Sequence, residues 1–223
     1  ADFHGAVLDS RLTATRFRRG ISTYNGLRGT SGDGNRTLWN TSISYPLMGS
    51  YWFITPKITY SLTHYNDIKH ARAEIDKSST RSLPIYSLDT GLIFERNSTV
   101  FGRETEQTLE PRLFYAYIPY RNQRHMPNFD SSSADLNFAE LFTPNKYTGF
   151  DRIANTNQLS AVLTTRYIDS GTGKEWFSAT VGQRYYFTDE KVDLYWSNPG
   201  KTKNRSDVLA ASQFSLFEGW RLE

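Results

Sequence analysis

Residues 107–123 of the chain read QTLEPRLFYAYIPYRNQ, and the first part of this stretch alternates between two kinds of side chain. One parity is apolar and rich in aromatic rings: Leu109, Pro111, Leu113, Tyr115 and Tyr117. The other parity is polar and carries two opposite charges: Thr108, Glu110 and Arg112. Since successive side chains of a strand point to opposite faces, the pattern predicts a β-strand with an apolar, aromatic face and a charged face. Such a strand is typical of a sheet whose apolar face meets lipid and whose polar face meets a wet lumen.

The composition agrees with a sheet of this kind. The chain has 223 residues, of which 38% are hydrophobic and 15% aromatic, and its mean hydropathy is -0.58. No apolar run approaches the ~20 residues of a spanning helix, which excludes a helical membrane protein. Barrel strands carry lipid-facing residues only at every second position, so a low mean hydropathy is compatible with a membrane β-barrel.

Charge and cysteine content exclude several classes of partner. The 26 basic and 23 acidic residues are interspersed, the formal net charge is +3, and no basic stripe suggests a nucleic-acid partner. The chain contains no cysteine, so neither a disulfide framework nor a thiolate metal site can form within it. It begins ADFHGAV and ends GWRLE, and we expect it to be a piece of a longer protein.

The alternation predicts eight strands and little helix. In residues 51–65, for example, Trp52, Ile54 and Ile58 oppose Thr55 and Lys57. The predicted strands cover residues 5–19, 36–47, 51–65, 82–96, 104–120, 156–169, 174–188 and 206–217. Pro111 lacks a backbone donor, so we expect a bulge or a weakened pairing where it lies.

Short and long connections alternate along the chain. Tight turns are predicted at 47–50, at 169–174 and after 217, and a medium connection at 95–104. Long polar loops are predicted near 20–35, 66–81, 121–155 and 188–205. This order places every long loop at one end of the sheet, as in outer-membrane barrels with short periplasmic turns and long extracellular loops.

The fold class predicted for residues 1–223 is therefore all-β, an antiparallel transmembrane β-barrel of the outer-membrane type. A soluble β-sandwich or β-solenoid is the alternative, but the ~12–17-residue strands here exceed the ~5–6 residues of average strands. Eight strands can close alone, yet we expect an arc of a larger barrel.

Charged side chains on the polar parity are candidates for the lumen. They are of mixed sign and include Lys57, Glu110, Arg112, Arg166 and Arg184. One interpretation is simple solvation of a barrel interior; the other is a polar conduit for a sugar-rich cargo.

The longest loop, 121–155, carries many large apolar residues and is too long for a passive connection. We expect it to fold over the barrel mouth, plug it, or contact a partner. The residues that we expect to make these contacts are Phe129, Phe138, Leu141, Phe142, Tyr147, Phe150, Asp151 and Arg152.

Catalytic and metal sites are weakly supported. His64, Asp67 and His70 lie at a strand end and in a polar loop, where no helix aligns them as ligands. Asp130, Asp135 and Asp151 lie in or beside the longest loop and His125 is near them, but no pair of base and nucleophile is recognisable. We therefore expect no enzyme activity, no metal and no cofactor.

Several blocks in consistent order resemble one family. RSLPIYSLDTGLIFER (81–96), QTLEPRLFYAYIPYRNQ (107–123), NFAELFTPNKYTGFDRIANTNQLSAVLTTR (137–166) and VGQRYYF (181–187) are similar to the middle of the LptD family of outer-membrane lipopolysaccharide-assembly proteins. YWFITPKITYSLTHY (51–65) fits the same family.

The resemblance implies a location in the outer membrane of a Gram-negative bacterium. It implies a very large barrel that inserts lipopolysaccharide into the outer leaflet, in contact with outer-membrane lipid. It also implies an LptE-like plug lipoprotein inside the barrel and an LptA-like periplasmic bridge of jellyrolls. A general porin or nutrient-uptake barrel is the alternative function, and a surface enzyme or adhesin is a third hypothesis.

Overall fold

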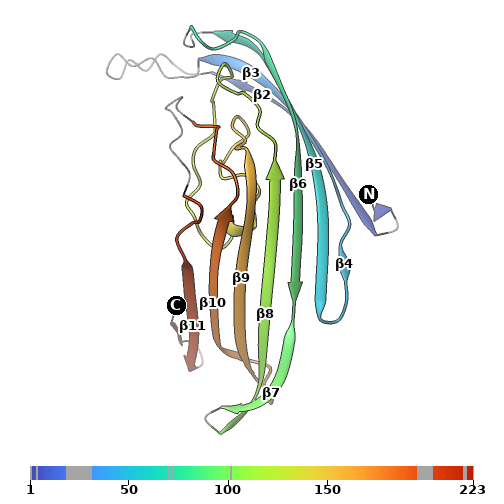
Figure 1. Ribbon diagram of the computed structural model, residues 1–223, viewed down its shortest axis with the longest axis vertical. Helices are drawn as coiled ribbons and strands as arrows, with labels where there is room; N and C mark the ends of the chain where they lie inside the picture. The colour runs from blue at the N-terminus through green and yellow to red at the C-terminus, as the bar shows by residue number, and fades with distance from the viewer. Residues whose placement is uncertain are drawn as a thin grey trace.

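The long alternating stretches of the sequence lie side by side in one curved antiparallel β-sheet (Figure 1). The computed structural model describes residues 2–3, 5–18, 32–69, 71, 73–100, 102–194, 203–217 and 220–222. The described residues form twelve strands and one short 3-10 turn. The all-β, antiparallel fold class is thereby confirmed, and the open sheet is consistent with an arc of a larger barrel. Among the described residues, no helix is long and apolar enough to cross a membrane.

Ten strands follow one another in the order β1-β2-β3-β5-β6-β8-β9-β10-β11-β12, with β4 beside β5 and β7 beside β8. Their bounds are β1 Asp2–Phe3, β2 Ala6–Phe17, β3 Asp33–Ser44, β4 Leu47–Met48, β5 Trp52–Lys69, β6 Ser79–Leu92, β7 Phe94–Val100, β8 Arg103–Ile118, β9 Thr156–Asp169, β10 Glu175–Tyr186, β11 Leu209–Phe217 and β12 Trp220–Leu222. The 3-10 turn covers Glu140–Phe142.

Two predicted boundaries are wrong. The strand predicted at 82–96 is two strands, β6 and β7, and most of the connection predicted at 95–104 is a hairpin of β7 and β8. The loop predicted at 66–81 is shorter, because β5 continues to Lys69 and β6 begins at Ser79. The reason is tertiary: Tyr65 and Ile68 are buried against Ile75 and Met126, and this packing extends the strand beyond its alternating part.

Pro111 marks an interrupted pairing, as expected. On one side, β8 pairs with β9 without a gap, and Pro111 lies opposite Leu163. On the other side, pairing with β6 ends at Arg112 and pairing with β7 resumes at Leu109. The gap lies beside the residue that has no N–H to donate, and the chain between β6 and β7 bends there.

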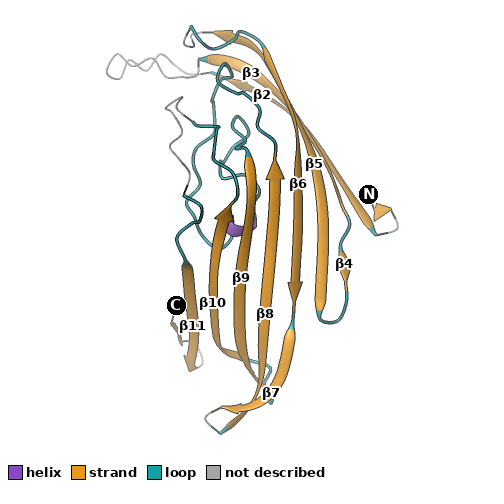
Figure 2. Cartoon of the chain, viewed as in Figure 1, coloured by secondary structure: helices purple, strands orange, loops and turns teal. Residues whose placement is uncertain are grey.

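The described connections alternate between shorter and longer ones. Figure 2 shows the long connections gathered at one end of the strands, which we call the loop end, and the short turns at the other, the turn end. At the turn end, the short turn between β9 and β10 is closed by Gly173, whose φ of 68° favours glycine. The loop predicted at 20–35 falls mostly outside the described residues, and so does part of the loop predicted at 188–205.

The two faces of the sheet have opposite character. Apolar residues of one parity are solvent-exposed, and Leu113, for instance, is 43% exposed. The neighbouring Phe114, which faces the other way, is 6% exposed. We call these the outer and inner faces. The apolar outside inferred from the sequence is thus a property of the folded sheet.

The core lies between the inner face and the connection after β8. Leu83 of β6 and Ile118 of β8 pack with Ile153 of this connection. Tyr147 and Ala154 pack with Val192 and Leu194 of the connection after β10. The inner face is therefore buried where the loops cover it, toward the loop end.

Candidate functional site

The candidate site is the contact between the inner face and residues 121–155, which we call the covering loop. This loop returns from the end of β8 and lies on the sheet before β9 begins (Figure 1). Three groups of contacts hold it there. They involve an ion cluster on β3 and β5, an arginine on β6, and the 3-10 turn on β8 to β10.

The ion cluster centres on Asp151, which is fully buried. Arg36 of β3 donates from Nη1 to Asp151 Oδ1 at 2.8 Å, and Tyr65 of β5 donates its hydroxyl to the same oxygen at 2.8 Å. The backbone N–H groups of Phe129 and Asp130 donate to Asp151 Oδ2 at 2.6 and 2.8 Å. One carboxylate thus fixes the loop to two strands and also fixes the loop's own turn.

Arg36 also holds a second carboxylate of the covering loop. Its two terminal nitrogens donate to the two oxygens of Asp130, each at 2.7 Å, in a bidentate pair. The guanidinium lies over the rings of Phe17 and Phe150, at 4.9 and 5.5 Å from their centroids. A buried arginine with these partners is satisfied, as burial of a charge requires.

The two carboxyls differ in their affinity for a proton. Partial burial is the largest single effect and opposes ionisation of Asp130, but the hydrogen bonds and charge of Arg36, the contact with Asp151 and the N–H of Phe150 together outweigh it and lower the pKa of Asp130 to about 2. Burial raises the pKa of Asp151, the neighbouring Asp130 adds to this, and Arg36 acts against it. Asp130 is therefore the firmly ionised partner of Arg36, whereas keeping Asp151 charged costs free energy.

Arg81 of β6 is the second attachment. It is fully buried and donates to the backbone carbonyls of Phe150 and Asp151 at 2.7 and 2.6 Å. It also donates to Gln123, whose amide group bonds the carbonyl and the N–H of Ile153. The guanidinium of Arg81 is thus bonded to main-chain oxygens of the loop, and these bonds fix the loop's backbone conformation on the sheet.

Arg152 stabilises the loop from within. It is buried, and it donates to the carbonyls of Met126 and Pro127 at 2.8 and 2.9 Å. Burial lowers the pKa of Arg152 relative to its ordinary value. Arg152, near the end of the covering loop, is therefore bonded to main-chain carbonyls near its beginning.

The 3-10 turn is the third attachment. Leu141 is fully buried on Gly182 of β10, where a Cβ would lie 2.8 Å from Leu141 Cδ1. Arg184 donates to the carbonyl of Glu140, and Gln158 donates to the carbonyl of Thr143 at 3.1 Å. A glycine at 182 is thus what lets the turn approach the sheet.

Below the covering loop the inner face is open and charged. Arg166 bridges Glu110 at 3.0 Å and Glu175 at 2.9 Å. Arg112 pairs with Asp89 at 2.6 Å and lies 3.7 Å from the centroid of the Phe142 ring. A concavity of about 440 Å³ lies between these charges and Phe138.

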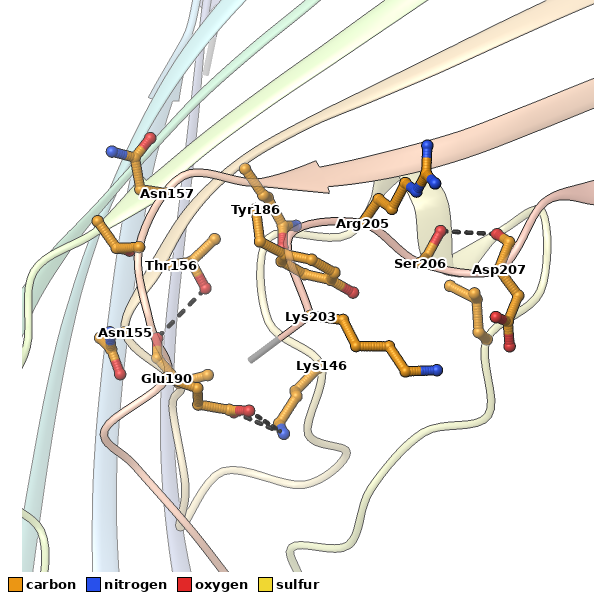
Figure 3. Close-up of a pocket in the computed structure, with 14 residues that line it drawn as sticks. Lys146, Asn155, Thr156, Asn157, Tyr186, Glu190, Lys203, Arg205, Ser206 and Asp207 are labelled. Atoms are coloured by element: carbon orange, nitrogen blue, oxygen red, sulfur yellow. Dashed lines mark hydrogen bonds and ion pairs between the residues drawn. The ribbon is translucent and has the colours of Figure 1, made fainter. Parts of the chain in front are cut away.

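A further cavity of about 270 Å³ lies at the loop end, between the covering loop and the connection after β10. Lys146 donates from Nζ to Glu190 Oε2 at 2.6 Å, and Figure 3 shows this pair and Tyr186 among the residues that line the cavity. Tyr147 donates its hydroxyl to the carbonyl of Val192 at 2.7 Å. These contacts join the covering loop to the next long connection.

All the residues predicted for the lumen lie on the inner face. Arg184 is buried under the covering loop, Glu110, Arg112 and Arg166 lie in the open part, and Lys57 lines a hollow beside Phe150. Of the predicted loop residues, Phe129 stacks on Phe17 of β2 with ring centroids 4.2 Å apart.

No sequence pattern singled out the side chains that receive the loop, Arg36, Tyr65, Arg81 and Gln123. The first three lie on the polar parity near the loop end of their strands. This position was the one feature of the sequence that could have marked them as contacts of a loop. Position alone does not tell which strand residues a loop contacts, because that depends on how the loop folds.

The residues considered for metal binding or catalysis are engaged elsewhere. His64 bonds Thr80 at 2.8 Å, Asp67 pairs with Lys69, and His125 bonds the carbonyl of Glu74. His70 lies outside the described residues. In the part of the chain that the structure describes, no group of three or more His, Cys, Asp and Glu side chains is placed to hold a metal ion.

Comparison with known proteins shows which family the chain resembles. The family model described as "LptD: LPS transport system D" matches residues 3–223. The "LPS-assembly protein LptD" of Ralstonia nicotianae is 43% identical over 222 residues, which are 98% of this chain and 26% of that protein. The protein of the same name from Paraburkholderia xenovorans is 41% identical over 208 residues, 90% of this chain and 26% of that protein. The chain thus spans about a quarter of the length of the curated relatives it matches.

Proposed function

The chain belongs to the LptD family, and on that premise we propose that it is part of an outer-membrane translocon for lipopolysaccharide. In this proposal the whole protein lies in the outer membrane of a Gram-negative bacterium and inserts lipopolysaccharide into the outer leaflet. Residues 1–223 form an arc of its transmembrane β-barrel domain. The long connections, the covering loop included, lie on the extracellular side.

The observation that carries the proposal is the opposite character of the two faces of one long antiparallel sheet. Leu109, Leu113 and Leu163 are exposed on the outer face, where lipid would cover them. The inner face carries charges and amides that would line a wet lumen. Burial of exposed leucines in lipid offsets the cost of placing the strands in a membrane.

The covering loop closes this lumen toward the loop end. Lipopolysaccharide carries acyl chains and a charged sugar portion, so it cannot cross a bilayer unaided. The open charged part of the inner face lowers the cost for the sugar portion. Because the covering loop lies across the path, its attachment must loosen or the cargo must leave laterally. The translocation step breaks no covalent bond, and we propose no catalytic role for this segment.

Partners follow from the same proposal. An LptE-like plug lipoprotein would occupy the lumen and contact the covering loop, with exposed Phe150 within its reach. An LptA-like periplasmic bridge would deliver the cargo toward the turn end. Both assignments rest on family membership.

The test is depletion of the full-length protein in its native bacterium, followed by pulse-labelling of new lipopolysaccharide and measurement of its arrival at the cell surface. We expect lipopolysaccharide to stall inside while uptake of small solutes is unchanged. Normal arrival at the surface would refute the proposal, and a loss of solute uptake would assign a porin instead.

A further inference from the structure

A hollow on the inner face differs from the rest of that face in its unpaired positive charges. It lies over β2, β3 and β5, with Phe150 of the covering loop at its edge, and its volume is about 270 Å³. Arg11 and Lys57 line it. Figure 1 shows these three strands as neighbours on the N-terminal side of the sheet.

The strand register fixes which side chains meet there. Asp9 pairs with Ser42 and Arg11 with Asn40 between β2 and β3, and Ser42 pairs with Thr59 between β3 and β5. Partners in a ladder point to the same face, and side chains two positions apart do as well. The six polar residues Asp9, Arg11, Asn40, Ser42, Lys57 and Thr59 therefore belong to one patch of the inner face.

The other strand cations that the structure describes on the inner face are neutralised or bonded. Arg36 holds Asp130 and Asp151, Arg112 holds Asp89, and Arg166 holds Glu110 and Glu175. Arg81 and Arg184 donate to main-chain carbonyls. By contrast, within the described ranges no carboxylate lies within ion-pair distance of Arg11 or Lys57. Arg11 and Lys57 thus face a single carboxylate in this hollow, that of Asp9, so the hollow keeps a net positive charge.

The hydrogen-bonding groups of the hollow suit a polyol. The side-chain oxygen of Asn40 is buried and accepts no hydrogen bond within the chain. Ser42 and Thr59 supply hydroxyls that both donate and accept, and Asp9 supplies acceptors. A sugar ring presents hydroxyls of both kinds, whereas a simple anion would leave the Asn40 oxygen without a donor.

We propose that this hollow binds a phosphorylated sugar, with Arg11 and Lys57 on the phosphate and Asn40, Ser42 and Thr59 on the ring hydroxyls. Arg offers a planar fork and Lys a point charge, and both favour phosphate oxygens. The volume is close to the lower end for small-molecule sites, so it accommodates a sugar residue with its phosphate rather than a long oligosaccharide. The inference rests on the proposed function, and it places the sugar portion of the cargo directly beside the covering loop.

The test measures binding to the purified full-length protein by isothermal titration calorimetry. The probe is the lipid-free core oligosaccharide released from lipopolysaccharide by mild acid, used with its phosphates and after their chemical removal. The variant Arg11→Gln with Lys57→Gln removes both charges while keeping polar side chains. Lys77→Gln with Arg124→Gln is the matched control, because it removes two exposed charges elsewhere near the loop end.

We expect the double variant at the hollow to weaken binding of the phosphorylated probe by about tenfold or more, with the control pair within about twofold of wild type. Equal binding by wild type and the Arg11→Gln, Lys57→Gln variant would overturn the site. Equal binding of the phosphorylated and dephosphorylated probes would overturn the role of the cations. If inorganic phosphate binds as tightly as the phosphorylated oligosaccharide, the hollow is a general anion site. If a polyglutamate peptide binds more tightly than the oligosaccharide, the hollow is a site for a protein partner.

The surface-arrival assay separates the two proposals. If wild-type protein restores lipopolysaccharide arrival but binds no oligosaccharide, the site fails while the proposed function stands. If depletion leaves arrival unchanged, the proposed function fails whatever the calorimetry shows.

Discussion

Asp151 shows what a single residue does in this molecule. Its carboxylate accepts hydrogen bonds from a strand arginine, a strand tyrosine and two loop N–H groups. Removing one partner of a buried ion pair leaves the other without compensation, which is costly. The attachment of the covering loop therefore depends strongly on this residue.

We expect Asp151→Asn to weaken the loop attachment by about 3 kcal/mol. Because trypsin cuts the loop only when it opens, cleavage within 121–155 should accelerate by roughly a hundredfold in the full-length protein. Asp135→Asn is the control, since Asp135 is an exposed carboxylate of the same loop. Unchanged cleavage of Asp151→Asn would contradict an attachment of the covering loop through Asp151.

The low pKa of Asp130 predicts that acid weakens the attachment of the covering loop. Its pKa in the folded protein is about 2, below the ~3.9 of an unfolded aspartate. Its contribution to stability is therefore present above pH ~4 and is lost as the pH falls toward ~2. In calorimetric melting over this range, Asp130→Asn should show a smaller acid-induced fall in Tm than wild type, and Asp135→Asn should match wild type. An equal fall in all three proteins would show that Asp130 does not carry the effect.

Gly182 makes a steric prediction. A Cβ at this position would lie 2.8 Å from Leu141 and 2.9 Å from Val162, so Gly182→Ala should cost about 1–3 kcal/mol by overpacking. Leu141→Ala removes one of the two clashes. The double variant should therefore be more stable in chemical unfolding than the sum of the single changes implies. Strict additivity would mean that the 3-10 turn does not rest on Gly182.

At the scale of the element, the strands are built for two environments. The chain between β6 and β7 bends where Pro111 interrupts pairing. The register with β8 is the same before and after the bend, so each parity keeps facing the same side of the sheet. A slip of one residue would have exchanged the two faces. The faces are therefore continuous from β5 to β10.

We expect Leu113→Lys to destabilise the protein in a bilayer by about 2–4 kcal/mol, because a lysine near the midplane of the lipid face is poorly solvated. Thr164→Lys is the matched control on the inner face, where it lies opposite Glu110. The measurement is the urea midpoint of the full-length protein folded into lipid vesicles. Equal midpoints for the two variants would refute the assignment of the outer face to lipid.

At the scale of the whole molecule, the sheet is open and its stability depends on neighbours. Within the described strands, β1 and β12 each pair on one side only. Unpaired edges present free N–H and C=O groups that favour association with other strands. The covering loop stabilises the inner face but closes neither edge.

We therefore expect residues 1–223 expressed alone to associate in detergent, whereas the full-length protein remains dispersed. Size-exclusion chromatography with light scattering measures this difference. A monodisperse, monomeric fragment with β-rich circular dichroism would show that the arc closes on itself.

The sequence by itself determined that the chain forms long strands and which side chains of each share a face, but not the break between β6 and β7. The two-residue period depends only on the backbone, so Leu113 and Arg112 could be assigned to opposite faces before any contact was known. The alternation of short and long connections likewise predicted that the long ones share one end. The apolar residues of 121–155, such as Phe129 and Leu141, indicated that this loop covers something.

Only the tertiary structure decided which strand residues the covering loop contacts and through which bonds. Arg36 and Asp151 are 115 positions apart, and no local pattern couples them. Their contact depends on the curvature of the sheet and on the turn that Asp151 itself stabilises. The same holds for the cations of the inner face, since whether Lys57 or Arg112 is neutralised depends on which strands lie beside it. Local periodicity is a property of the chain, whereas compensation of charge is a property of the assembled fold.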